Sequence, residues 1–135
     1  MAQKEKEKTA EIMDNYGKEL ILDLHNCDPA TFTRKSIRNY FKELCEVIDM
    51  ERCKLCWWDD LYTPEGEKET EPHLVGTTAI QFIKTSNITI HTLDILKRVY
   101  LNIFSCKDFD MNVVKKFSEK WFVGETVNSQ EVKRR

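Results

Sequence analysis

The sequence predicts an α+β fold, a two-layer sandwich in which a mainly antiparallel sheet carries two helices on one face. Three segments rich in strand-forming residues, 76–84, 88–92 and 98–106, follow one another without a helix between them. Such consecutive strands favour antiparallel pairing, because parallel neighbours need a long crossover connection. Two amphipathic helical segments, 33–48 and 110–120, are then available to cover one face of the sheet.

The N-terminal half is predicted to form a strand, a helix and a second strand. Residues 19–24 are a short apolar run that the turn-like sequence Asn-Cys-Asp-Pro closes. Over 33–48, apolar residues recur at the three-and-four spacing of one helical face, and Asp28 or Thr31 is the expected cap before them. Residues 54–58 are the expected second strand.

A polar loop over 61–72 follows the second strand and contains two of the three prolines of the chain. Connections of about a dozen residues are uncommon inside a compact domain and are often functional. The role of this loop is left open by the sequence.

The C-terminal half is predicted to contain a β-hairpin, another strand and the second helix. Thr85-Ser86-Asn87 is a polar break between the two hairpin strands. In the strand over 98–106, alternation separates two faces, one of which carries Tyr100, Asn102, Phe104 and Cys106. Asp110 is the expected cap of the helix, and a last short strand over 121–126 is left open. The residues expected to face inward from this helix are Val113, Val114, Phe117 and Trp121.

A length of 135 residues predicts one domain. We expect a charged leader over 1–16 that either frays or forms a short solvated helix, the domain itself over 17–126, and a polar tail over 127–135. The formal net charge is −2, so no strong field attracts the chain to nucleic acid or to an anionic membrane. No apolar run is long enough to span a membrane, and the N-terminus does not resemble a secretory signal. These features predict a cytoplasmic protein without a nucleic-acid or membrane partner.

Five cysteines are an odd number, which argues against a disulfide framework and for reduced thiols in the cytoplasm. Cys53 and Cys56 have the C-x-x-C spacing of zinc and redox motifs, and His73 lies downstream. A structural zinc site needs four ligands, and the chain has no second pair of this kind. We therefore predict no metal site.

Three residues that carry chemistry, Ser86, His91 and Cys106, lie in or beside the best-defined strands. Taken singly, a serine at a turn, a histidine on a strand and a cysteine at a strand end are usually structural. The sequences around them are TSNITIHT, starting at Thr85, and NIFSC, ending at Cys106. They resemble the core of the prokaryotic S-adenosylmethionine decarboxylases, in which Glu-Ser-His-x-x-Ile-His-Thr-Trp-Pro-Glu precedes a strand ending Asp-x-Phe-Thr-Cys. The serine-to-histidine spacing of five and the serine-to-cysteine spacing of twenty are both kept.

The start of the chain is also similar to this family. The sequence GKELILDLHNCD over 17–28 looks like the family's first strand and its Cys-Asp turn. The likeness continues to Val123, with an enlarged loop over 59–74.

The resemblance implies that the chain makes its own cofactor. In the family, the serine hydroxyl attacks the carbonyl of the preceding residue, and β-elimination then cuts the chain, here between Thr85 and Ser86. The serine becomes an N-terminal pyruvoyl group, which forms a Schiff base with the substrate amine and withdraws electrons during decarboxylation. The product is the aminopropyl donor for spermidine biosynthesis.

The same resemblance assigns roles to individual residues. Ser86 is the pyruvoyl precursor, and His91 is the base in processing, since a neutral imidazole near pH 7 suits that task. Cys106 is the acid that protonates the product. Thr78, eight residues before Ser86, occupies the place of a small hydroxyl residue that assists processing.

Trp57 and Trp58 are candidates for stacking on the adenine base of the substrate. They are adjacent on a strand, so one is expected to face the core and the other the opposite side of the sheet. Packing in a core or an interface is the commoner role of such residues. The family forms dimers that join through their sheets, which implies a homodimer here.

The sequence departs from the family pattern at three places. Thr85 stands for the family's glutamate, Asn87 for its histidine, and Leu93-Asp94-Ile95 for Trp-Pro-Glu. The last change replaces an acidic side chain by Ile95 and bears on substrate recognition more than on self-cleavage. Two alternatives stay open: a pyruvoyl decarboxylase of another amino acid, and an uncleaved, non-catalytic relative that acts as a binding or regulatory subunit.

Overall fold

The computed structural model describes residues 2–135, with the side chains of residues 11–14 outside the description. The strands are β1 (Gly17–His25), β2 (Arg52–Trp58), β3 (Gly76–Ile83), β4 (Ser86–Leu93), β5 (Arg98–Ser105) and β6 (Glu125–Arg134). They form one six-stranded sheet in the order β2-β3-β4-β5-β1-β6, and all neighbouring strands are antiparallel.

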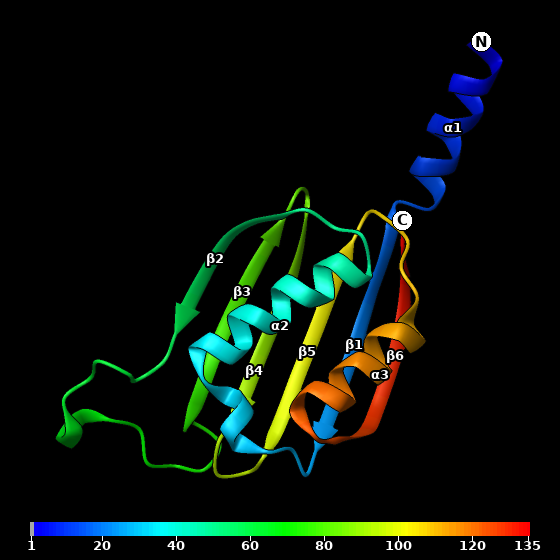
Figure 1. The fold of residues 1–135 in the computed structure, drawn as a ribbon. Coiled ribbons are helices and arrows are strands. Elements are labelled where there is room, and N and C mark those ends of the chain that lie inside the picture. The colour runs from blue at the N-terminus through cyan, green and yellow to red at the C-terminus, as the bar shows by residue number, and fades with distance from the viewer. Residues whose placement is uncertain (1) are drawn as a thin grey trace.

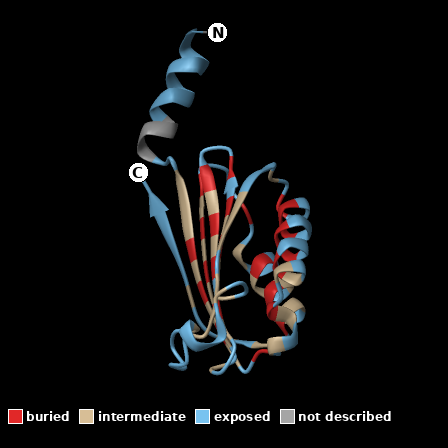
Figure 2. Ribbon diagram, turned by 90° about the vertical axis from the view of Figure 1, so that its left-hand side faces the viewer, coloured by how far each residue is buried: buried red, intermediate tan, exposed pale blue. Residues whose placement is uncertain are grey.

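Two helices cover one face of this sheet and leave the other face open (Figure 1). The helical elements are α1 (Ala2–Asp14), α2 (Arg34–Val47) and α3 (Met111–Phe122), with short 3-10 turns η1 (Pro29–Phe32) and η2 (Glu65–Glu67). Figure 2 shows the buried residues gathered between α2, α3 and the sheet. The predicted two-layer α+β sandwich is confirmed. Among the described residues, no helix combines the length and the apolar character that crossing a membrane requires.

Buried and partly exposed residues alternate along the central strands, and the buried ones form the core. Leu20, Leu22 and Leu24 of β1 are fully buried on the helix-covered face, and the residues between them are partly exposed. From the helices, Tyr40 packs against Phe122 with 4.7 Å between ring centroids. The core also buries Phe41, Ile88, Ile90, Val99, Leu101, Ile103 and Val114. Truncating a buried leucine of this kind to alanine typically costs 2–5 kcal/mol, so the helix-covered face fixes the register of the sheet.

The starts of α2 and α3 are capped by side chains. Asp110 caps α3 as predicted and accepts a hydrogen bond from the backbone N–H of Asn112 at 2.8 Å. The expectation that Asp28 or Thr31 caps the first long helix is wrong. Asp28 instead caps the intervening turn η1, and Thr33 caps α2 by accepting from the N–H of Ser36 at 3.1 Å.

One side chain of α3 that was predicted to face inward points toward solvent instead. Val113 is 38% exposed, whereas its neighbour Val114 is fully buried. Successive residues of a helix lie about 100° apart, so only one of two adjacent valines can point into a narrow contact with the sheet.

The N-terminal end takes one of its two expected forms, and the C-terminal strand differs from its expected bounds. Residues 2–14 form helix α1, the solvated-helix option, and it extends away from the sandwich (Figure 2). The last strand covers Glu125–Arg134 rather than 121–126, and it pairs with β1 from Gly17↔Arg134 to His25↔Glu125. Its residues are mostly exposed because β6 is an edge strand with no helix against most of it, so the apolar alternation that marks the inner strands is absent.

Candidate active site

The β3–β4 hairpin turns through only two residues, Lys84 and Thr85. Ser86 therefore begins β4, paired with Ile83, instead of lying inside a three-residue break as the sequence suggested. Thr85 has φ = 56°, in the left-handed region that β-branched residues rarely adopt. Backbone strain on the order of 1–3 kcal/mol accompanies such a residue. This strain lies next to the peptide bond between Thr85 and Ser86.

The turn holds the Ser86 hydroxyl against the end of β5. Ser86 Oγ accepts a hydrogen bond from the backbone N–H of Cys106 at 3.2 Å and lies 3.8 Å from its Sγ. The hydroxyl of Thr85 lies 3.3 Å from the same sulfur. The structure therefore brings Thr85, Ser86 and Cys106 together, although Ser86 and Cys106 are twenty residues apart.

The Cys106 thiol is surrounded by hydroxyl groups that favour its ionised form. A hydrogen bond with Thr85 lowers the pKa of Cys106 below its usual value; Ser86 and Tyr16 add to this, and partial burial opposes it. Tyr16 also stacks on Phe104, with 6.1 Å between ring centroids and 20° between the planes. The sequence analysis missed Tyr16. Its only signal is an aromatic residue directly before Gly17, where the first strand begins.

A second group of candidate residues lies on the open face of the sheet. Thr78 and His91 are cross-strand partners, and Thr78 Oγ1 is 2.8 Å from His91 Nδ1. Burial lowers the pKa of His91 below 6.5, so its imidazole is neutral at pH 7. Trp58 and Tyr100 lie beside this pair in the wall of a cavity of about 300 Å³.

These two groups are far apart within one chain. Ser86 and His91 are separated by five residues of β4, an odd number, so their side chains leave opposite faces of the sheet. At about 3.3 Å per residue, their backbones are about 16 Å apart along the strand. One chain therefore pairs Ser86 with Cys106 and Thr78 with His91, but it does not bring Ser86 to His91.

The two tryptophans face opposite sides of the sheet, as predicted. Trp58 is 54% exposed on the open face and lines the cavity that holds His91. Trp57 lies on the helix-covered face, where the guanidinium groups of Arg34 and Arg38 lie 5.5 Å and 5.7 Å from its ring centre. Of the two adenine-stacking candidates, the structure places Trp58 at the open-face site and Trp57 away from it.

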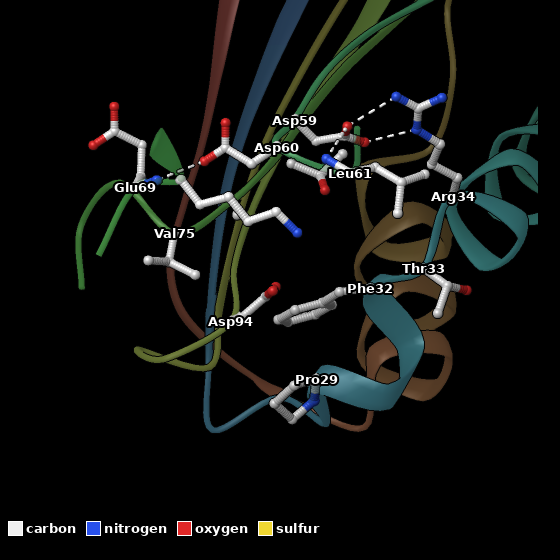
Figure 3. Close-up of a pocket in the computed structure, with 13 residues that line it drawn as sticks. Pro29, Phe32, Thr33, Arg34, Asp59, Asp60, Leu61, Glu69, Val75 and Asp94 are labelled. Atoms are coloured by element: carbon white, nitrogen blue, oxygen red, sulfur yellow. Dashed lines mark hydrogen bonds and ion pairs between the residues drawn. The ribbon is translucent and has the colours of Figure 1, made fainter. Parts of the chain in front are cut away.

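A larger cavity of about 500 Å³ lies on the helix-covered side, between η1, the loop after β2 and the start of β3 (Figure 3). Much of its charge is already paired, since Arg34 forms two hydrogen bonds to Asp59, at 2.7 Å and 2.8 Å. Asp94 also points into this cavity, close to Phe32, and burial raises its pKa. Asp94 therefore lies away from Thr78 and His91, and none of the predicted site residues lines this cavity.

The cysteine pair of β2 lies at an irregularity in the strand. The register between β2 and β3 shifts between Arg52 and Leu55, and Cys53 is exposed. Gln81 holds this irregularity by donating its side-chain amide to the backbone carbonyl of Cys53 at 3.1 Å. Among the side chains that the structure describes, no three histidine, cysteine or acidic groups gather in a way that would hold a metal ion, and all five cysteines are free.

Comparison with known proteins places the fold and the family. No curated protein matches the sequence significantly. Among solved structures, the adenosylmethionine decarboxylase from Aquifex aeolicus VF5 is similar, with a TM-score of 0.68 and 14% sequence identity over 89% of this chain and 91% of that chain. At this identity the likeness shows a shared fold. The model of the S-adenosylmethionine decarboxylase family matches residues 18–135, nearly the whole chain, and the protein therefore belongs to that family.

Proposed function

We propose that the chain cuts itself between Thr85 and Ser86 and then decarboxylates S-adenosylmethionine, with a pyruvoyl group derived from Ser86. The observation that carries the proposal is the hairpin, where the Ser86 hydroxyl lies beside both Cys106 and the strained Thr85. Membership of the family supports the substrate. The product is then the aminopropyl donor for spermidine biosynthesis, and the five free thiols fit a cytoplasmic enzyme.

Cleavage consumes one water molecule and needs no other co-reactant. Ser86 Oγ bonds to the carbonyl carbon of Thr85, the C–N bond breaks, and the hydroxyl proton moves to the released nitrogen, which gives an ester. Loss of the Ser86 Cα proton then breaks the Cβ–Oγ bond, and that oxygen stays in the new carboxylate of Thr85. Residue 86 is left as an enamine; after tautomerising it takes up water and releases ammonia, which yields the pyruvoyl group. Relief of the left-handed φ of Thr85 favours the cut.

The surroundings of residue 86 fit a pyruvoyl group and the decarboxylation reaction. A pyruvoyl carbonyl there supplies the electron sink for loss of carbon dioxide. Cys106 Sγ lies 3.8 Å from Ser86 Oγ, so its thiol is placed to deliver a proton to a substrate held on residue 86. Trp58, on the open face, offers an aromatic surface to a flat base or to a sulfonium cation.

A second copy of the chain supplies the base for cleavage. A general base has to lie within hydrogen-bond distance of its proton, yet His91 and Ser86 of one chain are about 16 Å apart on opposite faces. The open face that carries His91 also exposes Trp58 and Phe82, at 54% and 42%, and exposed aromatic side chains of this kind indicate an interaction surface. In a two-fold dimer joined through this face, His91 and Thr78 of each copy serve the hairpin end of the other, where the exposed Cys106 contacts Ser86.

A related substrate is the second candidate. The acidic position of the family is Ile95 here, 53% exposed, and Asp94 points into the cavity on the helix-covered side. The cavity around His91 therefore lacks a carboxylate from the segment that follows β4. This observation favours a pyruvoyl decarboxylase that recognises another amino acid by different contacts.

One experiment distinguishes the proposed function from the two alternatives, an uncleaved relative and a decarboxylase of another amino acid. The purified full-length protein is expected to give two masses under denaturing conditions, for residues 1–85 and 86–135, in place of one chain of 16.0 kDa. With carboxyl-labelled S-adenosylmethionine it is expected to release labelled carbon dioxide. A single 16.0 kDa chain would identify an uncleaved relative. A cut chain that is inactive on S-adenosylmethionine but active on a panel of other amino acids would identify the second candidate.

The rate of chain cleavage is expected to fall as the pH is lowered, with a midpoint below pH 6.5. The neutral imidazole of His91 is the reactive form, and burial lowers its pKa from 6.5, so protonation removes the base only at more acidic pH. Precursor made by cell-free translation and diluted into buffers across pH 5–8 gives the rate on denaturing gels. His25→Asn, a histidine on β1 outside this cavity, is the control and keeps the same profile. A midpoint above pH 6.5 would contradict the assignment.

A further inference from the structure

We propose that Lys18 is the positioning residue of Cys106 in the cut enzyme, because it ties the segment after Cys106 to β1 and β6. The inference rests on the proposed self-cleavage and goes beyond it. It concerns what keeps the thiol in place after the cut has removed the hydroxyl group of Ser86.

Cleavage removes the hydrogen bond that holds Cys106 to residue 86. In the whole chain the backbone N–H of Cys106 donates to Ser86 Oγ at 3.2 Å. Cleavage transfers this oxygen to the new carboxylate of Thr85, so residue 86 no longer offers a hydroxyl group as acceptor. Strand β5 ends at Ser105, so Cys106 lies just outside the backbone pairing of the sheet. After the cut, the position of Cys106 therefore depends on its neighbours in the following segment.

Lys18 gathers that segment around its ammonium group. Nζ lies 2.8 Å from Asp108 Oδ1 and 3.0 Å from Glu131 Oε1, and it donates to the backbone carbonyl of Phe109. The centre of the Phe109 ring lies 4.6 Å from the same nitrogen. The three hydrogens of the ammonium group thus have three oxygen acceptors. The side chain of Lys18 is only 12% exposed, so these contacts are screened little by water.

The residue before Lys18 lies against Cys106 itself. A Cβ atom on Gly17 would overlap the carbonyl oxygen of Ser105 and would be 2.8 Å from Cα of Cys106. A backbone can approach another this closely only where it carries no side chain. Lys18 pairs with Ser105 in the sheet. The first two residues of β1 therefore contact the segment over 105–109, Gly17 at its start and Lys18 at its end.

A second lysine holds the same segment from a more exposed place. Lys107 binds Asp49 at 2.7 Å, and their side chains are 52% and 94% exposed. Ion pairs that water surrounds in this way hold their partners weakly. Lys107 is therefore a matched control for Lys18, since it also carries a paired ammonium group close to Cys106.

The cut leaves the contacts of Lys18 in place but divides them between two fragments. Lys18 belongs to residues 1–85, whereas Asp108, Phe109 and Glu131 belong to residues 86–135. None of these contacts includes the severed peptide bond. Backbone pairing of β1 with β5 and β6 keeps the two fragments together. Lys18 acts at the end of that pairing, next to the residue that carries the thiol.

The test compares Lys18→Met, which keeps the length of the side chain and removes its charge, with Lys107→Met. Both chains are expected to be cut like the wild type, because the hydroxyl group of Ser86 still holds Cys106 before cleavage. In the cut Lys18→Met enzyme, kcat is expected to fall roughly tenfold to a hundredfold while KM changes little, since a proton donor displaced by about 1 Å transfers its proton more slowly. Lys107→Met should keep the wild-type kcat, and Lys18→Arg should recover most of it.

Two further measurements show whether Lys18 acts through the thiol. Adding Lys18→Met to Cys106→Ala is expected to lower kcat no further, because the group that Lys18 positions is already missing. Glu131→Gln weakens the same contacts from the other fragment and is expected to lower kcat about threefold, with KM unchanged. This variant retains Lys18, and so it tests the role even if Lys18→Met folds poorly.

The outcomes separate this inference from the proposed function. A cut Lys18→Met enzyme with the kcat of the wild type would overturn the role of Lys18 and leave the proposed function standing. An equal loss in Lys107→Met, or a further loss when Lys18→Met is added to Cys106→Ala, would also overturn it. A wild-type chain that stays whole would overturn the proposed function, and this role with it.

Discussion

Ser86→Ala is expected to leave every chain whole at 16.0 kDa and to abolish decarboxylation. Without the hydroxyl oxygen no ester forms at Thr85, so the peptide bond is not cut and the electrophilic carbonyl is never made. The loss of activity should span the whole catalysed rate, at least about 10⁶-fold, because the group that accelerates the reaction is missing. Intact mass spectrometry and carbon dioxide release measure the two effects on the same sample.

The variant should still fold. Ser86 is 8% exposed, and its Oγ accepts one hydrogen bond, from the N–H of Cys106. Losing that bond costs about 0.5–1.5 kcal/mol, a small part of the stability of a domain this size. Ser129→Ala on β6 is the matched control and should be cut and active like the wild type. A whole Ser86→Ala chain that still decarboxylates, or one that is cut, would contradict the mechanism.

The inner strands could be predicted because their two faces meet different environments. Leu20, Leu22 and Leu24 alternate with polar or partly exposed residues, and a slip by one residue would turn all three toward the open face. The edge strand β6 could not be placed in this way, since both of its faces are largely exposed and no apolar alternation marks it. Its position is set by backbone pairing with β1, a long-range contact that side-chain pattern does not report.

The candidate site could be predicted only in part from the sequence. The resemblance to the family assigned Ser86 and Cys106 to one site, and the hairpin brings the two together. The distance between Ser86 and His91 depends on both residues lying in one extended strand. A turn that ends at Thr85 puts Ser86 inside β4, and this moves it to the face opposite His91.

The position of Tyr16 could not be predicted from the sequence for a different reason. It stacks on Phe104 only because β1 lies beside β5, a neighbour that is far away along the chain. Periodicity identifies residues that share a face of one element. It does not say which element lies next to that face, and strand order settled this for Tyr16.

Two inactive variants are expected to restore cleavage when they are combined in one dimer. Ser86→Ala lacks the nucleophile, and His91→Ala lacks the base in both sites of its own dimer. In a mixed dimer, one site joins the Ser86 of the His91→Ala chain to the His91 of the Ser86→Ala chain, and the other site lacks both groups. Only the His91→Ala chains should then be cut, about half of them when equal amounts of the two chains assort at random.

The measurement is intact mass spectrometry of the two chains after co-expression, with a tag on one so that their masses differ. The control pairs His91→Ala with the double variant Ser86→Ala/His91→Ala, which supplies no imidazole and should leave both chains whole. If His91 acted within its own chain, the mixture of single variants would also stay whole, because no chain would carry both groups. Cleavage of the Ser86→Ala chain in the mixture would contradict both arrangements. Restored cleavage confined to the His91→Ala chain would place the base in the second copy, as the 16 Å separation along β4 requires.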